Sequence, residues 1–416
     1  MAVVVENLTE NLRHSHPKIS LVSTYPPERG GVAYYTFGLV AGIRNLVNLQ
    51  IVANKTNEIG FNDIAVVRCW RRNSVFYPLS IFIQCIRFNG DLIHLQHHYL
   101  SYGGNLSALE FPLILLGLKI IHKPFLVTLH SVIPKSKLNS HLFQRYGLGT
   151  YLSGFKNMLM GLLVKSIVQL SDALIVHNSY MKECLIRDYG ANSKKVFIIP
   201  IGVRDISSLE YKSAKVLLGL PDRKIILYQG FITEGKGVEI LIKAFRQVHQ
   251  IDHNTLLVIA GCFRRGNTRY AQLIGSLIME KSPTESIIIT GFVPEEKLPL
   301  YFFASDVIVL PYTETDILGS SAVLADVALA GKPIVATRTP KLLGLLRDGH
   351  NALLVDPGSV EQLATAILSV LSDEKTATSL ATTLRKDALT RTWDKIALTT
   401  LSVYNHVIGL HHDAKK

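Results

Sequence analysis

The chain alternates short apolar segments with longer segments of helical periodicity over almost its whole length. The short segments are rich in Val, Ile and Leu, which is typical of parallel strands that are buried on both faces. The first group of predicted strands is Lys18–Ser23, Asn48–Val52, Leu92–Gln96, Phe125–Leu129, Ala173–Val176 and Val196–Ile199. The second group is Lys224–Tyr228, Leu256–Ala260, Ser286–Thr290, Asp306–Leu310, Pro333–Ala336 and Ala352–Val355. Strands that alternate with helices in this way predict βαβ units and an α/β fold.

The two groups of strands are similar in length, which predicts two doubly wound, Rossmann-like domains. Polar residues interrupt the pattern between Gly202 and Lys215. We expect a loose tail at residues 1–16, an N-terminal domain at 17–203 and a second domain at 204–391. Residues 392–416 are predicted to form a helix that packs back on the N-terminal domain.

Composition narrows the class of protein. The 44 basic and 32 acidic residues give a net charge of +12, which favours anionic partners such as nucleotide phosphates, nucleic acid or an acidic membrane surface. Nucleic acid is set aside because the aromatic RNA-binding motifs are absent. The four cysteines form no CxxC pair, and no run of 18 apolar residues or signal peptide is found. We therefore expect a cytoplasmic protein without a zinc site or a membrane-spanning helix.

Glycines, a histidine, a lysine and an acid follow the predicted strands. They are Gly30, Gly31, His130, Gly230, Lys236, Gly291 and Glu314. In open α/β sheets, ligands bind beyond the carboxyl ends of the strands. Two such edges that face a central cleft would hold a ligand between the domains.

The segment from Leu310 to Thr337 carries the most information about that ligand. A predicted strand leads into a loop with Glu314 and Asp316, and a helix is predicted to begin near Gly319, Ser320 and Ser321. A helix N-terminus attracts phosphate, and carboxylates accept hydrogen bonds from hydroxyl groups. The combination indicates a nucleotide-sugar.

Each candidate also has an ordinary structural interpretation. Gly30 and Gly31 fit a common βα turn as well as a close approach to phosphate. His130 fits a capping or buried histidine as well as a hydrogen bond to a sugar hydroxyl. Lys236 fits a solvated loop lysine as well as a contact to a diphosphate leaving group, and Gly237 at the next position excludes a P-loop.

Residues 131–170 interleave basic and aromatic side chains. This pattern suits peripheral contact with an anionic membrane. It suits equally a core-packed helix with a solvated basic face.

Several motifs together resemble the retaining glycosyltransferases of GT-B fold in family 4. They are STYPPERGGVAYY, LQHHYLSYGG, TLHS, SDALIVHNSYMKE, IIPIGV, GFITEGKG, GFVPEEKLPLYFFASDVIVLPYTE and ALAGKPIVATRTP. The resemblance extends from Lys18 to the C-terminal helix and implies the GT-B fold, two Rossmann-like domains that face a cleft.

The resemblance also implies roles for individual residues. Gly30 and Gly31 would close on phosphate or acceptor, and His130 would lie beside the donor sugar. Gly230 and Lys236 would hold the diphosphate. Donor sugar, phosphates, ribose and base would be contacted by Glu314 or Asp316, Ser320, Ser321, Asp326, Gly291, Phe292 and Val293.

Two positions depart from the family pattern. Leu318 stands where the first carboxylate of the family's Glu-x7-Glu motif is expected, and Asp326 stands at the second. Phe231 replaces an arginine five positions before Lys236. Glu314 or Asp316 is the candidate replacement for the first carboxylate.

The resemblance implies a retaining transferase that moves a hexose from a UDP- or GDP-sugar to a glycan, a lipid-linked acceptor or a small molecule. The resemblance also implies that neither a tightly bound cofactor nor a metal is required, and the chain agrees in having no Asp-x-Asp motif. The two departures leave open a weakly active or inactive GT-B protein that binds a glycan or partner. A sugar-nucleotide epimerase or hydrolase of the same fold also remains open.

Overall fold

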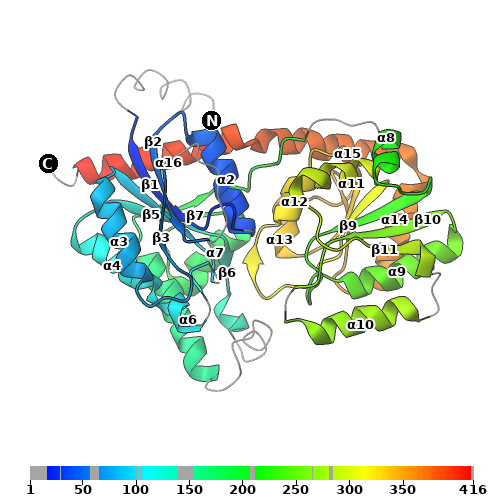
Figure 1. Ribbon diagram of the computed structural model, residues 1–416, viewed down its shortest axis with the longest axis horizontal. Coiled ribbons are helices and arrows are strands. Elements are labelled where there is room, and N and C mark those ends of the chain that lie inside the picture. Colours follow the sequence, from blue (N-terminus) through cyan, green and yellow to red (C-terminus); the bar gives the residue numbers. More distant parts are fainter. Residues whose placement is uncertain are drawn as a thin grey trace. The chain divides into compact units, whose positions relative to one another are not determined.

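The computed structural model describes residues 16–28, 30–56, 65–99, 101–103, 105–138, 153–206, 211–264, 266–280 and 284–413. The chain forms two compact units, residues 1–200 with 393–416 and residues 201–392. Figure 1 shows an α/β arrangement in each. The predicted tail at 1–16 lies almost entirely outside the described residues.

Unit 1 is built on a parallel sheet of seven strands in the order β3-β2-β1-β4-β5-β7-β8. Its strands are β1 (Lys18–Ser23), β2 (Asn48–Asn54), β3 (Val66–Trp70), β4 (Leu92–His97), β5 (Phe125–Leu129), β7 (Ala173–Val176) and β8 (Val196–Ile198), with the short β6 (Ser131–Val132) outside the sheet. Its helices are α2 (Gly31–Ile43), α3 (Tyr77–Phe88), α4 (Phe111–Ile120), α6 (Ser153–Leu170), α7 (Ser179–Tyr189) and α16 (Trp393–Asp413).

Unit 2 repeats the plan with six parallel strands in the order β11-β10-β9-β12-β14-β15. The strands are β9 (Lys224–Gln229), β10 (Thr255–Ala260), β11 (Ile287–Ile289), β12 (Val307–Leu310), β14 (Ile334–Thr337) and β15 (Leu353–Val355), and β13 (Leu318–Gly319) lies apart. The helices are α8 (Tyr211–Leu217), α9 (Val238–Ile251), α10 (Thr268–Met279), α11 (Leu298–Ala304), α12 (Ala322–Val327), α13 (Pro340–Leu343), α14 (Val360–Ser372) and α15 (Glu374–Ala388).

Both sheets are doubly wound, as the alternation predicted. In each, the chain moves outwards from a central strand on one side and then returns to start the other half. The reversal falls between β1 and β4 in unit 1 and between β9 and β12 in unit 2. Such switch points are where open α/β sheets bind ligands, because neighbouring loops diverge there.

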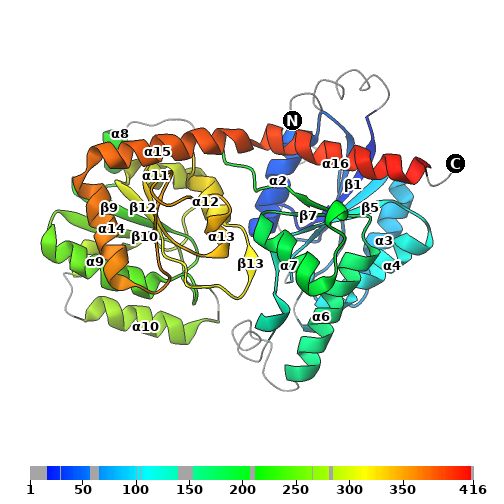
Figure 2. The same ribbon diagram turned by 180° about the vertical axis from the view of Figure 1, so that it is seen from behind.

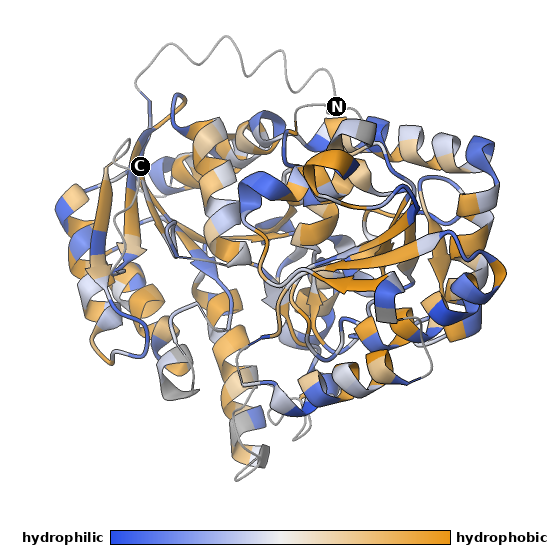
Figure 3. Cartoon of the chain, turned by 45° about the vertical axis from the view of Figure 1, so that its right-hand side comes forward, coloured by the Kyte–Doolittle hydropathy of each residue, from blue (hydrophilic) through white to orange (hydrophobic). Residues whose placement is uncertain are grey.

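Apolar strands fill both cores, which is why the strand prediction succeeded. Most strand residues are buried, and the sheets appear mainly orange in the hydropathy colouring of Figure 3. Strand β3 was not predicted. Its residues are mostly half-buried, since it lies at the sheet edge and carries Arg68.

The C-terminal helix α16 belongs to unit 1 and packs along α2. Figures 1 and 2 both show α16 running beside α2. The two helices approach closely because Gly38 and Gly42 have no side chains. A β-carbon on Gly38 would lie 2.1 Å from the ring of Trp393, and one on Gly42 would lie 2.7 Å from its carbonyl oxygen.

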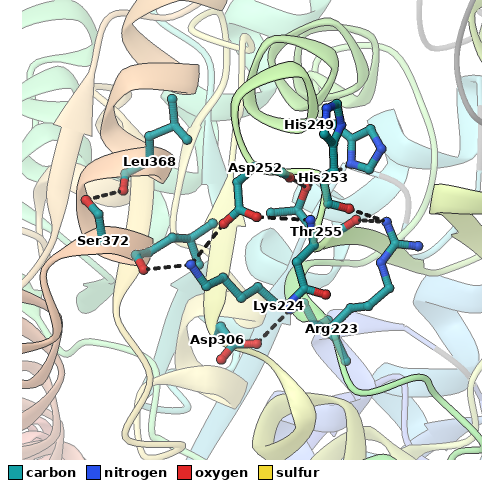
Figure 4. A network of polar contacts seen from close by, with 12 residues as sticks. Arg223, Lys224, His249, Asp252, His253, Thr255, Asp306, Leu368 and Ser372 are labelled. Carbon is teal, nitrogen blue, oxygen red and sulfur yellow. Dashed lines mark hydrogen bonds and ion pairs between the residues drawn. The ribbon is translucent and has the colours of Figure 1, made fainter.

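A polar cluster holds the amino end of the unit 2 sheet together (Figure 4). Lys224 on β9 donates to Asp252 at 2.9 Å. Asp306 accepts a hydrogen bond of 2.7 Å from the backbone N–H of Ile225. Arg223 donates to the carbonyl of Thr255. These contacts join β9 to its neighbours at the edge opposite the switch-point loops.

Candidate functional site

The loop between β9 and α9 carries Lys236 at the switch point of unit 2. It turns sharply because Gly235 and Gly237 have φ angles of 80° and 70°. A β-carbon on Gly237 would lie 1.8 Å from the carbonyl oxygen of Pro311, so only glycine permits this approach to the loop after β12. The carbonyl of Gly235 accepts a hydrogen bond of 3.1 Å from the N–H of Glu314. The two loops are therefore held together as one surface.

Lys236 is a half-buried cation within this surface. Its ammonium nitrogen lies 4.1 Å from the centre of the Tyr312 ring, a cation–π distance. Burial lowers the pKa of Lys236 from 10.5 to about 8, and the carboxylate of Glu314 acts in the opposite direction. Loss of hydration outweighs the attraction of that carboxylate, so the ammonium gains from an incoming anion.

The structure brings Glu314 and Lys236 together at the carboxyl edge of the unit 2 sheet, where the sequence pattern placed both residues. Glu314 is only 7% exposed, and its Oε1 accepts a hydrogen bond of 2.8 Å from the N–H of Asp316. The carboxylate thus closes a turn of its own loop while it lies within electrostatic reach of Lys236. Asp316 is half-buried at the next bend.

Ser320 and Ser321 precede α12. Ser321 caps this helix, since its Oγ accepts from the N–H of Leu324 at 3.1 Å and lies 3.0 Å from the hydroxyl of Tyr312. Ser320 is half-buried beside it. Helix α12 has six residues. The sequence interpretation assigned the phosphates to this helix end and to Lys236 together, and the full charge of Lys236 exceeds the partial charge that so short a helix offers.

The loops after β9 and β11 each turn at a glycine of positive φ. Gly230 has a φ of 130°, and a β-carbon on Gly261 would lie 1.9 Å from its carbonyl oxygen. Gly291 has a φ of 73°, and Phe292 after it is 49% exposed. Val293 packs on the core of unit 2 and anchors this loop.

Asp326 on α12 is held by an arginine that the sequence did not single out. Nε of Arg204 lies 3.0 Å from Asp326, and its NH2 group lies 3.0 Å from Glu295. Burial raises the pKa of Asp326, and the guanidinium of Arg204 opposes that change. Arg204 stands alone in its segment, so no local pattern pointed to it.

In unit 1, Gly30 and Gly31 form the turn between β1 and α2. The carbonyl of Gly30 accepts from the N–H of Tyr34 at 3.1 Å, which starts the helix. A β-carbon on either glycine would meet no heavy atom within 4 Å. Packing alone does not demand glycine here, and the open space lies at the switch point beside β4.

His130 follows β5 and belongs to a chain of buried polar groups. Its Nε2 lies 2.7 Å from the side-chain amide of Gln96, and its Nδ1 lies 3.0 Å from Nε2 of His177. Gln96 continues to Nε2 of His94 at 3.1 Å, and Nδ1 of His94 reaches the hydroxyl of Tyr404 at 2.7 Å. This series of hydrogen-bonded side chains, which we call the histidine relay, therefore connects the loop after β5 to the C-terminal helix.

The hydrogen-bond partners fix the tautomers of His177 and His130. Nδ1 of His177 lies 2.9 Å from the carbonyl of Ile199, which can only accept, so this nitrogen carries a proton. Burial lowers the pKa of His177 to about 4, so the ring is neutral at pH 7 and its Nε2 accepts. His130 must then donate from Nδ1. Burial also lowers the pKa of His130, so its Nε2 accepts. The amide of Gln96, whose Oε1 is placed 2.7 Å from this nitrogen, must then be flipped so that its NH2 group faces the ring.

This arrangement sharpens the prediction for His130. Both ring nitrogens already have partners in unit 1, so the ring does not stand free at the strand end. A sugar hydroxyl can bond to Nε2 as a donor only by replacing the amide of Gln96. Sequence reasoning singled out His130 but not His177. The two residues are 47 positions apart in the sequence, and only the fold brings their rings together.

Within the described residues, no group of three or more His, Cys, Asp or Glu side chains is placed to hold a metal ion.

Comparison with known proteins agrees with both halves of this architecture. The family model described as Glycosyltransferase Family 4 matches residues 29–205, and that described as Glycosyl transferases group 1 matches residues 212–387. The chain belongs to the GT-B glycosyltransferases.

Individual relatives of this GT-B glycosyltransferase have low sequence identity to it and match only part of its length. An uncharacterized glycosyltransferase of Methanocaldococcus jannaschii is 30% identical over 44% of this chain and 45% of its own length. A GDP-mannose-dependent alpha-(1-6)-phosphatidylinositol monomannoside mannosyltransferase of Mycolicibacterium smegmatis is 25% identical over 41% of this chain and 44% of its own. The chain spans about half the length of the curated relatives it matches.

A solved structure shares the fold over nearly the whole chain. The Anabaena protein HepE, in complex with UDP and glucose, superposes with a TM-score of 0.72 at 17% identity. The match covers 94% of this chain and all of that one.

Proposed function

We propose that the chain is a retaining glycosyltransferase that moves a hexose from a UDP- or GDP-sugar to a glycan, lipid-linked or small-molecule acceptor. The observation that carries the proposal is the pairing of a half-buried lysine of lowered pKa with a buried glutamate across two switch-point loops. HepE binds UDP, and the mycobacterial relative is named for GDP-mannose, which supports these two nucleotides.

Lys236 would neutralise the diphosphate as it leaves. The C1–O bond to the phosphate breaks, and a new C1–O bond forms to the acceptor on the same face of the sugar. The acceptor's proton passes to the departing phosphate oxygen. An ammonium already short of hydration stabilises the growing negative charge more strongly than a solvated one would.

The remaining residues would position the donor. Glu314 or Asp316 would accept hydrogen bonds from sugar hydroxyls, with Ser320 and Ser321 beside them. Gly230 would let phosphate approach the backbone.

The nucleoside would lie along the loop after β11. Gly291, Phe292 and Val293 would border the base, because Phe292 offers an exposed ring. Asp326 would receive the ribose while Arg204 holds the carboxylate in place.

Unit 1 would supply the acceptor side. Gly30 and Gly31 leave space for phosphate or acceptor. His130 would meet the donor sugar through Nε2, in place of Gln96. The relay from His177 would keep that nitrogen unprotonated and ready to accept.

A panel of UDP-, GDP- and ADP-sugars tests the donor assignment by thermal shift. A ligand at about 100 times its dissociation constant stabilises the folded state by about 2.7 kcal/mol, which is readily detected. We expect a shift with a UDP- or GDP-sugar and a smaller one with the nucleoside alone. If no sugar nucleotide in the panel raises the melting temperature, the proposed function is wrong.

The alternative is a GT-B protein that binds without turnover. It is favoured by Leu318, which is buried and apolar where the family has a carboxylate, and by Phe231 in place of arginine. Release of UDP or GDP from the donor that binds separates the two. Release in the presence of an acceptor supports the transferase, whereas a bound donor that is never consumed supports the binding module.

A further inference from the structure

Helices α3, α4 and α6 cover the same face of the unit 1 sheet. Successive parallel strands β3, β4, β5 and β7 advance in one direction, and right-handed crossovers place their connecting helices on one side. Helix α3 contacts α4, and α4 contacts α6. A β-carbon on Gly117 of α4 would lie 2.9 Å from the ring of Phe82 on α3, so the helices are closely packed. Their outer sides form one continuous surface.

Helix α3 and its N-cap residue expose a row of large apolar side chains on that surface. Phe76, Leu79, Ile83 and Ile86 are spaced at i, i+3, i+7 and i+10, and they are 69%, 56%, 40% and 41% exposed. This spacing places them on one side of the helix. The buried row that packs on the sheet includes Ile81 and lies on the opposite side.

Helices α4 and α6 repeat the same arrangement at i, i+3 and i+7. The exposed residues on α4 are Leu113, Leu116 and Ile120. Those on α6 are Phe155, Met158 and Leu162. In Figure 3, the helix that projects at the bottom, α6, is orange over much of its length. We call these rows on α3, α4 and α6 the outer apolar face.

The charged residues within the three helices have one sign. The three helices contain no Asp or Glu, although a stretch of this length would carry about three at the chain's average. Their basic residues include Arg87, Lys119 and Lys165. Lys119 is neutralised by Asp172, just beyond α6, at 2.7 Å. A surface without carboxylates and with flanking cations is complementary to anionic lipid headgroups.

A bilayer fits the outer apolar face better than a protein partner. Soluble monomers rarely expose so extended an apolar patch, and the same exposed apolar row on three adjacent helices suits a surface as extended as a bilayer. No helix among the described residues is long and apolar enough to cross a membrane, so the contact would be peripheral. The membrane contact predicted from the sequence, residues 131–170, contains α6 and does not extend to α3 and α4; residues 139–152 lie outside the described part of the chain.

We propose that the outer apolar face lies on an anionic bilayer and that the acceptor is lipid-linked. Helices α3 and α4 follow β3 and β4, so they begin near the carboxyl edge that carries Gly30, Gly31 and His130. Phe76 lies at that end of α3. A headgroup in the bilayer would reach the acceptor side along this edge. The acceptor class rests on the proposed function, whereas membrane docking does not.

Flotation with lipid vesicles tests the docking surface. The vesicles are phosphatidylcholine alone and phosphatidylcholine with roughly one-third phosphatidylglycerol, each at low and high salt. We expect binding to the anionic vesicles, weakened by salt. The variant L79Q/L116Q should lose at least tenfold in binding. The control I251Q/M279Q removes side chains that are 71% and 81% exposed in unit 2, and it should bind like the wild type.

The outcomes separate this proposal from the proposed function. A donor-induced thermal shift, retained in L79Q/L116Q, shows that the variant is folded and that the donor site is independent. Failure of the wild type to float, or flotation that L79Q/L116Q leaves unchanged, overturns membrane docking even if donors bind. A dimer in light scattering that the same variant dissociates would assign the face to a second copy and would also overturn it.

Discussion

Replacing Lys236 with methionine should raise the stability of the protein while it weakens donor binding. The pKa of Lys236 falls from 10.5 to about 8, and each unit corresponds to about 1.4 kcal/mol, so the charge costs the folded state up to about 3 kcal/mol at pH 7. Because the side chain is only half-buried, solvent screening reduces this, and we expect about 1–3 kcal/mol. Methionine has a similar length without the charge.

The pH dependence of this gain has a definite sign. Below pH 8 the lysine is charged in both folded and unfolded chains, so the cost is fully present. As the pH rises from about 8 to 10.5, the folded state loses its proton first and the cost disappears. The stability advantage of Lys236→Met should therefore be constant below pH 8 and vanish towards pH 10.5.

Donor binding should change in the opposite direction. A charge-assisted contact to phosphate contributes roughly 1.5–3 kcal/mol, so the variant should bind its donor about 10- to 150-fold more weakly. The assay combines thermal unfolding at several pH values with calorimetric titration of the donor. Lys243→Met is the matched control, because Lys243 is exposed on α9 and its removal should change neither quantity. A lower melting temperature for Lys236→Met with unchanged donor affinity would refute the reasoning.

Two further substitutions examine the supports of the site. Gly237→Ala should destabilise the protein by more than about 2 kcal/mol in thermal or denaturant unfolding, because its β-carbon would overlap the carbonyl of Pro311 and φ is positive; Gly275→Ala, with open space around it, should not. His177→Phe should lower kcat more than it changes donor affinity, since His130 loses the acceptor that fixes its tautomer; an unchanged kcat would show that the relay has no positioning role.

Sequence pattern predicted the fold well because burial on both faces gives a parallel strand a nearly continuous apolar run. Strand β5 was located to the residue, as was β7. Strand β3 escaped because an edge strand is covered less completely, which lets Arg68 and Cys69 interrupt its run. The C-terminal helix was also predicted, but the glycines that admit it against α2 have no local signature.

The candidate site was predicted in position and not in its contacts. The carboxyl end of a strand is a local feature, so the positions of Lys236 and Glu314 at this edge followed from the sequence alone. Their surroundings depend on residues far away in the chain. Tyr404 is 310 positions from its partner His94, and Arg204 is 122 positions from Asp326. No short motif records such pairs, and only the fold brings them together.

The most direct test of the account is the anomeric configuration of a transferred sugar. The donor that gives the largest thermal shift is supplied with a ¹³C label at C1, together with an acceptor mixture that includes lipid-linked and soluble glycans. The account predicts a product whose C1 signal keeps the configuration of the donor, with one UDP or GDP released for each bond formed. A product of inverted configuration, or a bound donor that yields no glycosidic product with any acceptor, would contradict it.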